Sequence, residues 1–110
     1  MAYDEELANR IRELLADEAG VTERKMFGGL AFLVNGNMCV GASHTGGLLA
    51  RVDPIESDEA LASPHAARME MGGRSMAGWI TVAPEGVAGQ RDLDSWVARS
   101  LGYVRTLPAK

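Results

Sequence analysis

Hydrophobic residues near the N-terminus recur at the spacing of an amphipathic helix. The stripe consists of Leu7, Ile11, Leu14 and Leu15, and charged residues fill the positions between them. We therefore expect a helix over residues 4–19. Asp4 suits its N-cap, and Gly20 suits the left-handed residue that ends a helix.

The middle of the chain changes to short apolar runs separated by glycines. The runs 30–34 and 38–40 are joined through Asn35-Gly36, a pair that accepts the positive φ angles of a tight hairpin turn. A further run, 48–52, follows after another glycine-rich turn. The short connections predict three antiparallel strands in a meander.

The second half predicts two helices and two strands. Pro54 suits the first turn of a short helix with Ile55, Ala60 and Leu61 on one face. An edge strand is expected around Met69 and Met71, and another strand at 79–82. A last helix is expected from Asp92, as its cap, to about Thr106. Its apolar stripe consists of Leu93, Trp96, Val97, Leu101 and Val104.

This order of elements predicts an α+β fold in which an antiparallel sheet is flanked by N- and C-terminal helices. The chain has 110 residues, of which 46% are hydrophobic. That length and composition suit a single domain, 1–110, with one core and no need for stabilising disulfides or metals.

The net charge and the length of the apolar runs indicate which kinds of partner and which cellular location to expect. The net charge of −4 disfavours a protein that grips nucleic acid through its phosphates, so direct nucleic-acid binding is not expected. No apolar run is long enough to span a membrane or to act as a secretion signal. We therefore expect a cytoplasmic protein without membrane contact.

Cysteine and histidine residues give little reason to expect catalysis. Cys39 is the single cysteine and lies in an apolar strand, which favours a buried small hydrophobe over a nucleophile paired with His44. Metal binding by Cys39, His44 and His65 would need all three to meet in the fold. We expect no catalytic residue, no metal and no cofactor.

The pair Gly28-Gly29 has two interpretations. Glycine-rich loops can bind anions through backbone N–H groups, but this pair lacks the phosphate-loop spacing and precedes a strand. A bend where another backbone packs closely is the preferred interpretation.

Basic and aromatic residues provide the candidate binding residues. If Lys25, Arg51 and Arg74 meet near Phe27 and Trp79 on one face of the sheet, they form a cationic and aromatic patch suited to a protein or an anion. The alternative is that the two arginines are ordinary outward-facing strand residues.

Four segments occur in the order and spacing of a known family. They are residues 24–30 (RKMFGGL), 49–54 (LARVDP), 76–79 (MAGW) and the ending 96–110. Together they resemble the N-terminal domain family of the TfoX/Sxy competence regulators over nearly the whole chain. The resemblance places Lys25, Met26, Phe27, Gly28, Gly29, Arg51, Gly78 and Trp79 in the family motif, which carries no assigned catalytic role.

The resemblance implies an α+β domain like the type III secretion chaperones, and a role in inducing competence genes. We expect a single-domain member without the C-terminal domain of the full-length regulators. The preferred hypothesis is a non-catalytic bacterial interaction module that acts on transcription through an unidentified protein partner, with homodimerisation also open. The alternative is a small-molecule (anion) binding protein or minor enzyme with a pocket near Gly28-Gly29, the anion being held by Lys25, Arg51 or Arg74.

Overall fold

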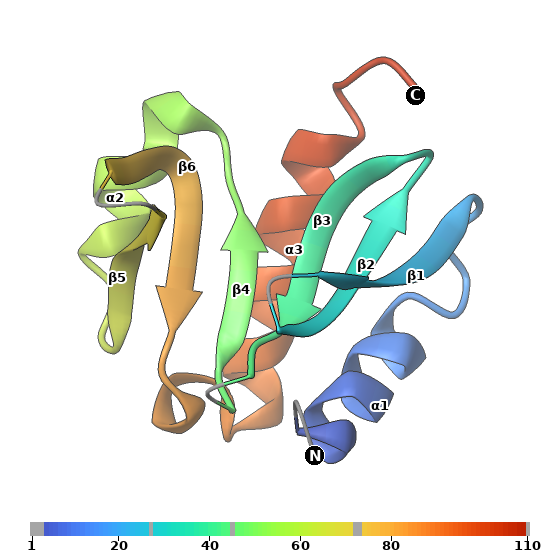
Figure 1. The fold of residues 1–110 in the computed structure, drawn as a ribbon, viewed down its shortest axis with the longest axis horizontal. Helices are drawn as coiled ribbons and strands as arrows, with labels where there is room; N and C mark the ends of the chain where they lie inside the picture. Colours follow the sequence, from blue (N-terminus) through green and yellow to red (C-terminus); the bar gives the residue numbers. More distant parts are fainter. Residues whose placement is uncertain (1–3, 27, 45, 72–73, 110) are drawn as a thin grey trace.

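The computed structural model describes residues 4–26, 28–44, 46–71 and 74–109, and of residues 70, 71 and 74–77 the backbone alone. Within these ranges the chain forms a six-stranded antiparallel sheet with helices against one face (Figure 1). The strands are β1 (Val21–Met26), β2 (Gly29–Val34), β3 (Asn37–Ala42), β4 (Leu48–Arg51), β5 (Ala66–Met71) and β6 (Arg74–Val82). The predicted α+β class is confirmed.

The order across the sheet is β1-β2-β3-β4-β6-β5. The predicted meander corresponds to β2, β3 and β4, and β5 is the predicted edge strand. The hairpin between β2 and β3 turns at Asn35 and Gly36, whose φ angles of 52° and 84° are those of a tight primed turn. The sequence signal for this turn is confirmed.

The helix-covered face holds the larger part of the core. Alternate residues of β2, namely Leu30, Phe32 and Val34, lie in one buried cluster with the apolar stripes of α1 (Glu5–Leu14) and α3 (Gln90–Val104). Figure 1 shows α3 running behind β3 and β4. The remaining β2 residues are also buried, on the other face, so β2 is apolar along its whole length.

The helix ends differ from the prediction in two places. Asp4 does cap α1, accepting hydrogen bonds from the backbone N–H groups of Glu6 and Leu7. However, α1 ends at Leu14, well before residue 19, and Gly20 instead occupies the turn before β1 with a φ of 78°. In α3 the N-cap is Gly89, and Asp92 lies inside the first turn, where its charge favours the helix dipole.

Strand β1 is the element that the hydrophobic pattern misses. Its four central residues are exposed and polar, because β1 is an edge strand with few apolar neighbours. Arg12 of α1 binds both carboxylate oxygens of Glu23 at 2.7 Å, so a charged pair holds this strand to the helix.

The connection between β4 and β5 contains a short 3-10 turn, Pro54–Glu56, followed by α2 (Ser57–Leu61). Ala60 is buried as expected, but Ile55 is 91% exposed and does not join the apolar face predicted for it. Pro84–Val87 forms another 3-10 turn between β6 and α3. Among the described residues, no helix is long and apolar enough to cross a membrane.

Candidate functional site

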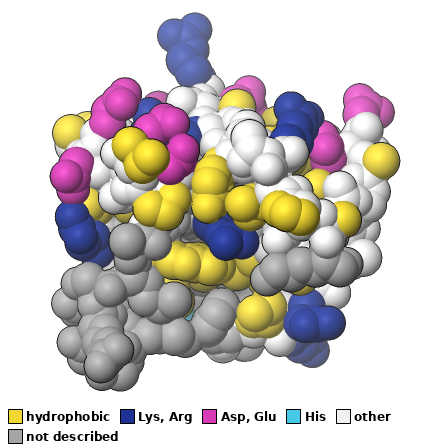
Figure 2. Space-filling view, turned by 90° about the horizontal axis from the view of Figure 1, so that it is seen from above, with side chains coloured by type: hydrophobic (Ala, Val, Ile, Leu, Met, Phe, Trp, Pro, Cys, Tyr) yellow, Lys and Arg dark blue, Asp and Glu magenta, His cyan; other side chains and the backbone are white. Residues whose placement is uncertain are grey.

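The face of the sheet turned away from the helices carries a second, smaller apolar cluster, and none of the residues described in it comes from a helix. We call this surface the open face. Its cluster consists of Ala31, Leu33, Met38, Leu49 and Met69, with Met26 and Trp79 packed against it. Figure 2, seen from above Figure 1 and so toward the ends of the strands, shows hydrophobic side chains across the middle of the molecule with basic and acidic side chains around them.

The open face is cationic although the protein is acidic overall. Arg24 lies opposite Ala31 and Arg51 lies opposite Trp79, so the strand register places both arginines on this face. Glu23 points to the helix side, where it binds Arg12. Among the described strand side chains of the open face there is no carboxylate, in a chain of net charge −4.

Arg51 contacts two aromatic rings at the end of the sheet, one from the open face and one from α3. Its guanidinium carbon lies 5.2 Å from the ring centre of Trp79 and 5.6 Å from that of Tyr103 on α3. Both distances are within the range of a cation–π contact. We call Arg51, Trp79 and Tyr103 the Arg51 group. All three side chains are half-buried, so the group remains accessible to a partner.

Gly78 explains how Trp79 is positioned. Its φ is +82°, and its carbonyl accepts a 2.7 Å hydrogen bond from the N–H of Val52. A Cβ at this position would lie 2.8 Å from the Val52 carbonyl oxygen. The Gly78-Trp79 step of the resemblance motif therefore has a structural role next to the Arg51 group.

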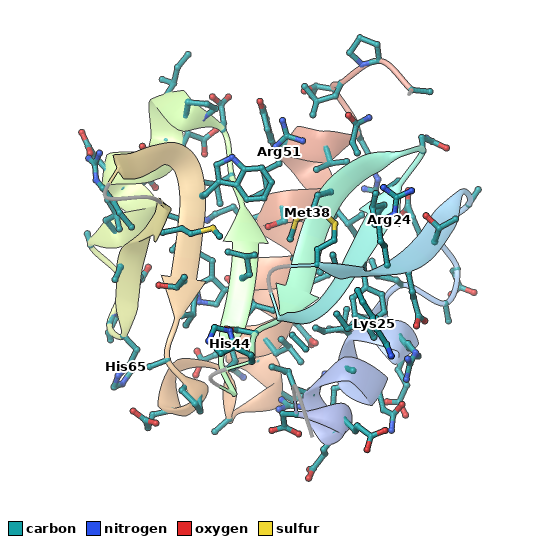
Figure 3. All side chains as sticks on the ribbon, in the orientation of Figure 1. Arg24, Lys25, Met38, His44, Arg51 and His65 are labelled. Carbon is teal, nitrogen blue, oxygen red and sulfur yellow. The ribbon has the colours of Figure 1, made fainter. Side chains whose placement is uncertain are left out.

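A hollow of about 330 Å³ lies on the open face beside Gly29. His44 lines it and, as Figure 3 shows, lies at the opposite end of β4 from Arg51. The described lining residues are Met26, Gly29, Leu30, Ala31, Met38, Gly41, Ala42, Ser43, His44, Leu49, Arg68, Met69 and Thr81. We refer to this space as the hollow.

The bend at Gly28-Gly29 brings two strands into close approach, as preferred from the sequence. Gly28 has a φ of +77°, and a Cβ on Gly29 would lie 2.1 Å from the carbonyl oxygen of Ala42. The second glycine is therefore required by the neighbouring backbone.

The remaining candidates do not assemble as one patch. Lys25 lies opposite Leu30 and so belongs to the helix side of β1, whereas Arg24 lies on the other side (Figure 3). The convergence of Lys25 with Arg51, one of the two interpretations open from the sequence, does not occur, because successive strand residues alternate between faces and Lys25 faces the helix side. Phe27 and the side chain of Arg74 lie outside the described part of the chain.

Cys39 is a buried core residue on the helix side, as predicted. Burial raises the pKa of its thiol to about 12, so the thiol stays protonated at neutral pH. His44 lies on the other side of the sheet, in the lining of the hollow, and His65 is exposed beside Gly86 of the Pro84–Val87 turn. In the described ranges, no three His, Cys, Asp or Glu side chains are grouped as metal ligands would be.

Sequence comparison gives one match. A family model described as the TfoX N-terminal domain matches residues 13–103, a span that includes β1 to β6, the Arg51 group and the hollow. No curated protein and no solved structure matches the chain.

Proposed function

The chain belongs to the TfoX N-terminal domain family, and we propose that it is a non-catalytic bacterial interaction module that regulates competence-type genes through contacts with a protein partner. In this proposal the partner docks on the open face. The residues that anchor it are Arg51 and Trp79.

The observation that carries the proposal is the separation of charge between the open face and the rest of the molecule. An acidic protein directs Arg24 and Arg51 to a face whose other described strand residues are apolar or uncharged. Aromatic and arginine side chains contribute most of the binding energy in protein interfaces. The chemistry of this face therefore suits a protein surface that combines apolar and acidic residues.

The orientation of Arg51 supports its role as an anchor. Trp79 and Tyr103 hold the guanidinium in place, so less side-chain entropy is lost when a partner carboxylate binds. The methionines Met26, Met38 and Met69 of the open-face cluster are flexible and can adapt to the shape of a partner.

The test is affinity capture from lysate of the native cell, quantified by mass spectrometry. The variant is Arg51→Glu, and the matched control is Arg91→Glu, which makes the same charge change at an exposed position in the first turn of α3. We expect a transcription protein to be captured by the wild type and by the control, and to be lost with Arg51→Glu. Circular dichroism establishes that all three proteins are folded.

Equal capture by all three proteins would remove Arg51 from the binding site. If the wild type captures no transcription protein, the proposed function itself is contradicted.

A second function, small-molecule binding, is favoured by the hollow. Its volume of about 330 Å³ lies within the usual range of ligand pockets, roughly 300–1,000 Å³. It is placed beside the Gly28-Gly29 bend, where the sequence suggested a pocket. Saturation binding of a small molecule that shifts the NMR signals of the lining residues would support this function.

A further inference from the structure

The side chains that line the hollow are mostly apolar. Met26, Ala31, Met38, Leu49 and Met69 come from five different strands and belong to the cluster of the open face. Three of them are methionines, whose flexible thioethers adapt to guests of different shape. The interior therefore suits an apolar ligand.

Among the residues that the structure describes, no guanidinium or ammonium group is directed into the hollow as an anion site would require. Arg68 is among the lining residues, but it lies opposite Ile80, whose side chain is in the helix-side core. Its guanidinium binds Asp58 of α2 at 2.8 Å. The charge of Arg68 is thus directed to the other side of β5.

His44 supplies hydrogen-bonding capacity at one end of the hollow. It is exposed, it follows β3, and its Cβ is close to the bend at Gly28. An imidazole can both donate and accept hydrogen bonds. Thr81 also lines the hollow, but its hydroxyl donates to the Ala67 carbonyl at 3.3 Å.

From these contacts we propose that the hollow binds a small, uncharged, apolar molecule with one hydrogen-bonding end, the apolar part lying among Met38, Leu49 and Met69 and the polar end at His44. This inference rests on the second function proposed above and names its ligand class. It differs from the anion considered from the sequence: Lys25 lies on the helix side of β1, Arg51 is not among the lining residues, and the side chain of Arg74 lies outside the described part of the chain.

A charged end group would bind less well for a physical reason. Moving a carboxylate out of water is costly unless a cation or several hydrogen bonds replace its hydration. An alcohol loses much less hydration and needs only one partner. A comparison of an alcohol with a carboxylate on the same alkyl chain therefore distinguishes the proposed uncharged ligand from an anionic one.

The experiment compares octanol with octanoate by NMR of the protein labelled at its methionine methyl groups. We expect octanol to shift the Met38 and Met69 signals in a saturable way, and octanoate to bind at least roughly tenfold more weakly. Tighter binding of octanoate would overturn the ligand class while leaving small-molecule binding in place. If neither compound shifts these signals, both the inference and the second function fail.

Two variants locate the binding. Ala31→Leu fills the hollow and should abolish the octanol shifts, whereas Ala98→Leu makes the same change at an exposed position on α3 and should not. His44→Ala leaves the strands intact and should weaken octanol binding several-fold, as expected for the loss of one hydrogen bond. Unchanged octanol affinity in both Ala31→Leu and His44→Ala would place the ligand elsewhere and overturn the inference.

Discussion

The thiol of Cys39 shows how burial determines the chemistry of one residue. It is fully buried in the helix-side core, and desolvation raises its pKa to about 12. Since the thiolate is the reactive form, we expect no reaction of the folded protein with an aromatic disulfide reagent at neutral pH. The same reagent should react fully once the chain is unfolded in guanidinium. Equal rates in the folded and unfolded protein would contradict the buried position.

Ser100 is buried in α3, and its hydroxyl has no hydrogen-bond partner among the described residues. An unsatisfied buried hydroxyl is unfavourable, so Ser100→Ala should raise the free energy of unfolding by about 1 kcal/mol. Ser95→Ala is the control, because Ser95 is exposed on the same helix and changes helix propensity alone. Urea unfolding measures both variants, and an equal gain in the two would show that burial of the hydroxyl has no cost.

For single residues, the sequence predicts burial and close backbone packing better than it predicts which side chains lie together in the fold. The burial of Cys39 and the close backbone at Gly29 were predicted, and the proximity of Arg51 and Trp79 was one of two interpretations left open. Lys25 does not lie with them because it faces the helix side of β1. The face of each β1 residue could not be predicted, since the polar sequence of this strand has no apolar alternation.

Substitution by alanine should have opposite effects on stability at Gly29, in a strand, and at Gly102, in a helix. A Cβ on Gly29 in β2 would lie 2.1 Å from the carbonyl oxygen of Ala42 in β3, whereas a Cβ on Gly102 in α3 meets nothing within 4 Å. We expect Gly29→Ala to lower the free energy of unfolding by about 1–3 kcal/mol, as overpacked positions do. Gly102→Ala should raise it by about 0.5–1 kcal/mol through helix propensity. Urea unfolding checks both, and a stable Gly29→Ala would contradict the close approach of the strands.

The contact between α1 and β1 should depend on pH. Arg12 on α1 donates two hydrogen bonds to the carboxylate of Glu23 on β1, and these lower the pKa of Glu23 from its usual value of 4.5. The unfolded chain therefore takes up the proton first, so the stability from this pair is present above about pH 4.5 and is lost as the pH falls below that value.

Glu23→Gln should accordingly reduce the loss of stability on acidification, measured by urea unfolding across this range. Glu13→Gln is the control, since it removes an exposed carboxylate from α1, the helix that carries Arg12. The effect is small, because both side chains of the Arg12–Glu23 pair are partly exposed. An identical acid dependence in the two variants would show that the pair contributes nothing.

Elements with a clear apolar period were predictable, and those held by other forces were not. The stripes of α1 and α3 and the turn at Asn35-Gly36 gave the main part of the fold. Strand β1 is held by backbone pairing with β2 and by Arg12, neither of which appears in a hydrophobic pattern. The predicted burial of Ile55 was wrong, because an apolar residue near the start of a short helix does not have to face the core.

The two faces of the sheet define the whole molecule. One face is covered by α1 and α3, and the other combines an apolar cluster with the exposed Arg24 and the stacked Arg51. The sequence predicted the strands that build these faces except β1. It could not predict the hollow, because the lining residues come from strands far apart in the chain and their phases are set by register and by bulges in β2–β3 and β5–β6 pairing.

The central claim is that partner proteins bind the open face, and site-specific photo-cross-linking tests it most directly. A benzophenone side chain is placed in turn at Arg24 on β1, at Ala67 on β5 and, as a control, at Ala98 on α3, all three exposed. Arg24 and Ala67 border the open face and are not the proposed anchors. We expect adducts with one transcription protein from positions 24 and 67 and none from position 98. Adducts from position 98 alone would place the partner on the helix side and contradict the account.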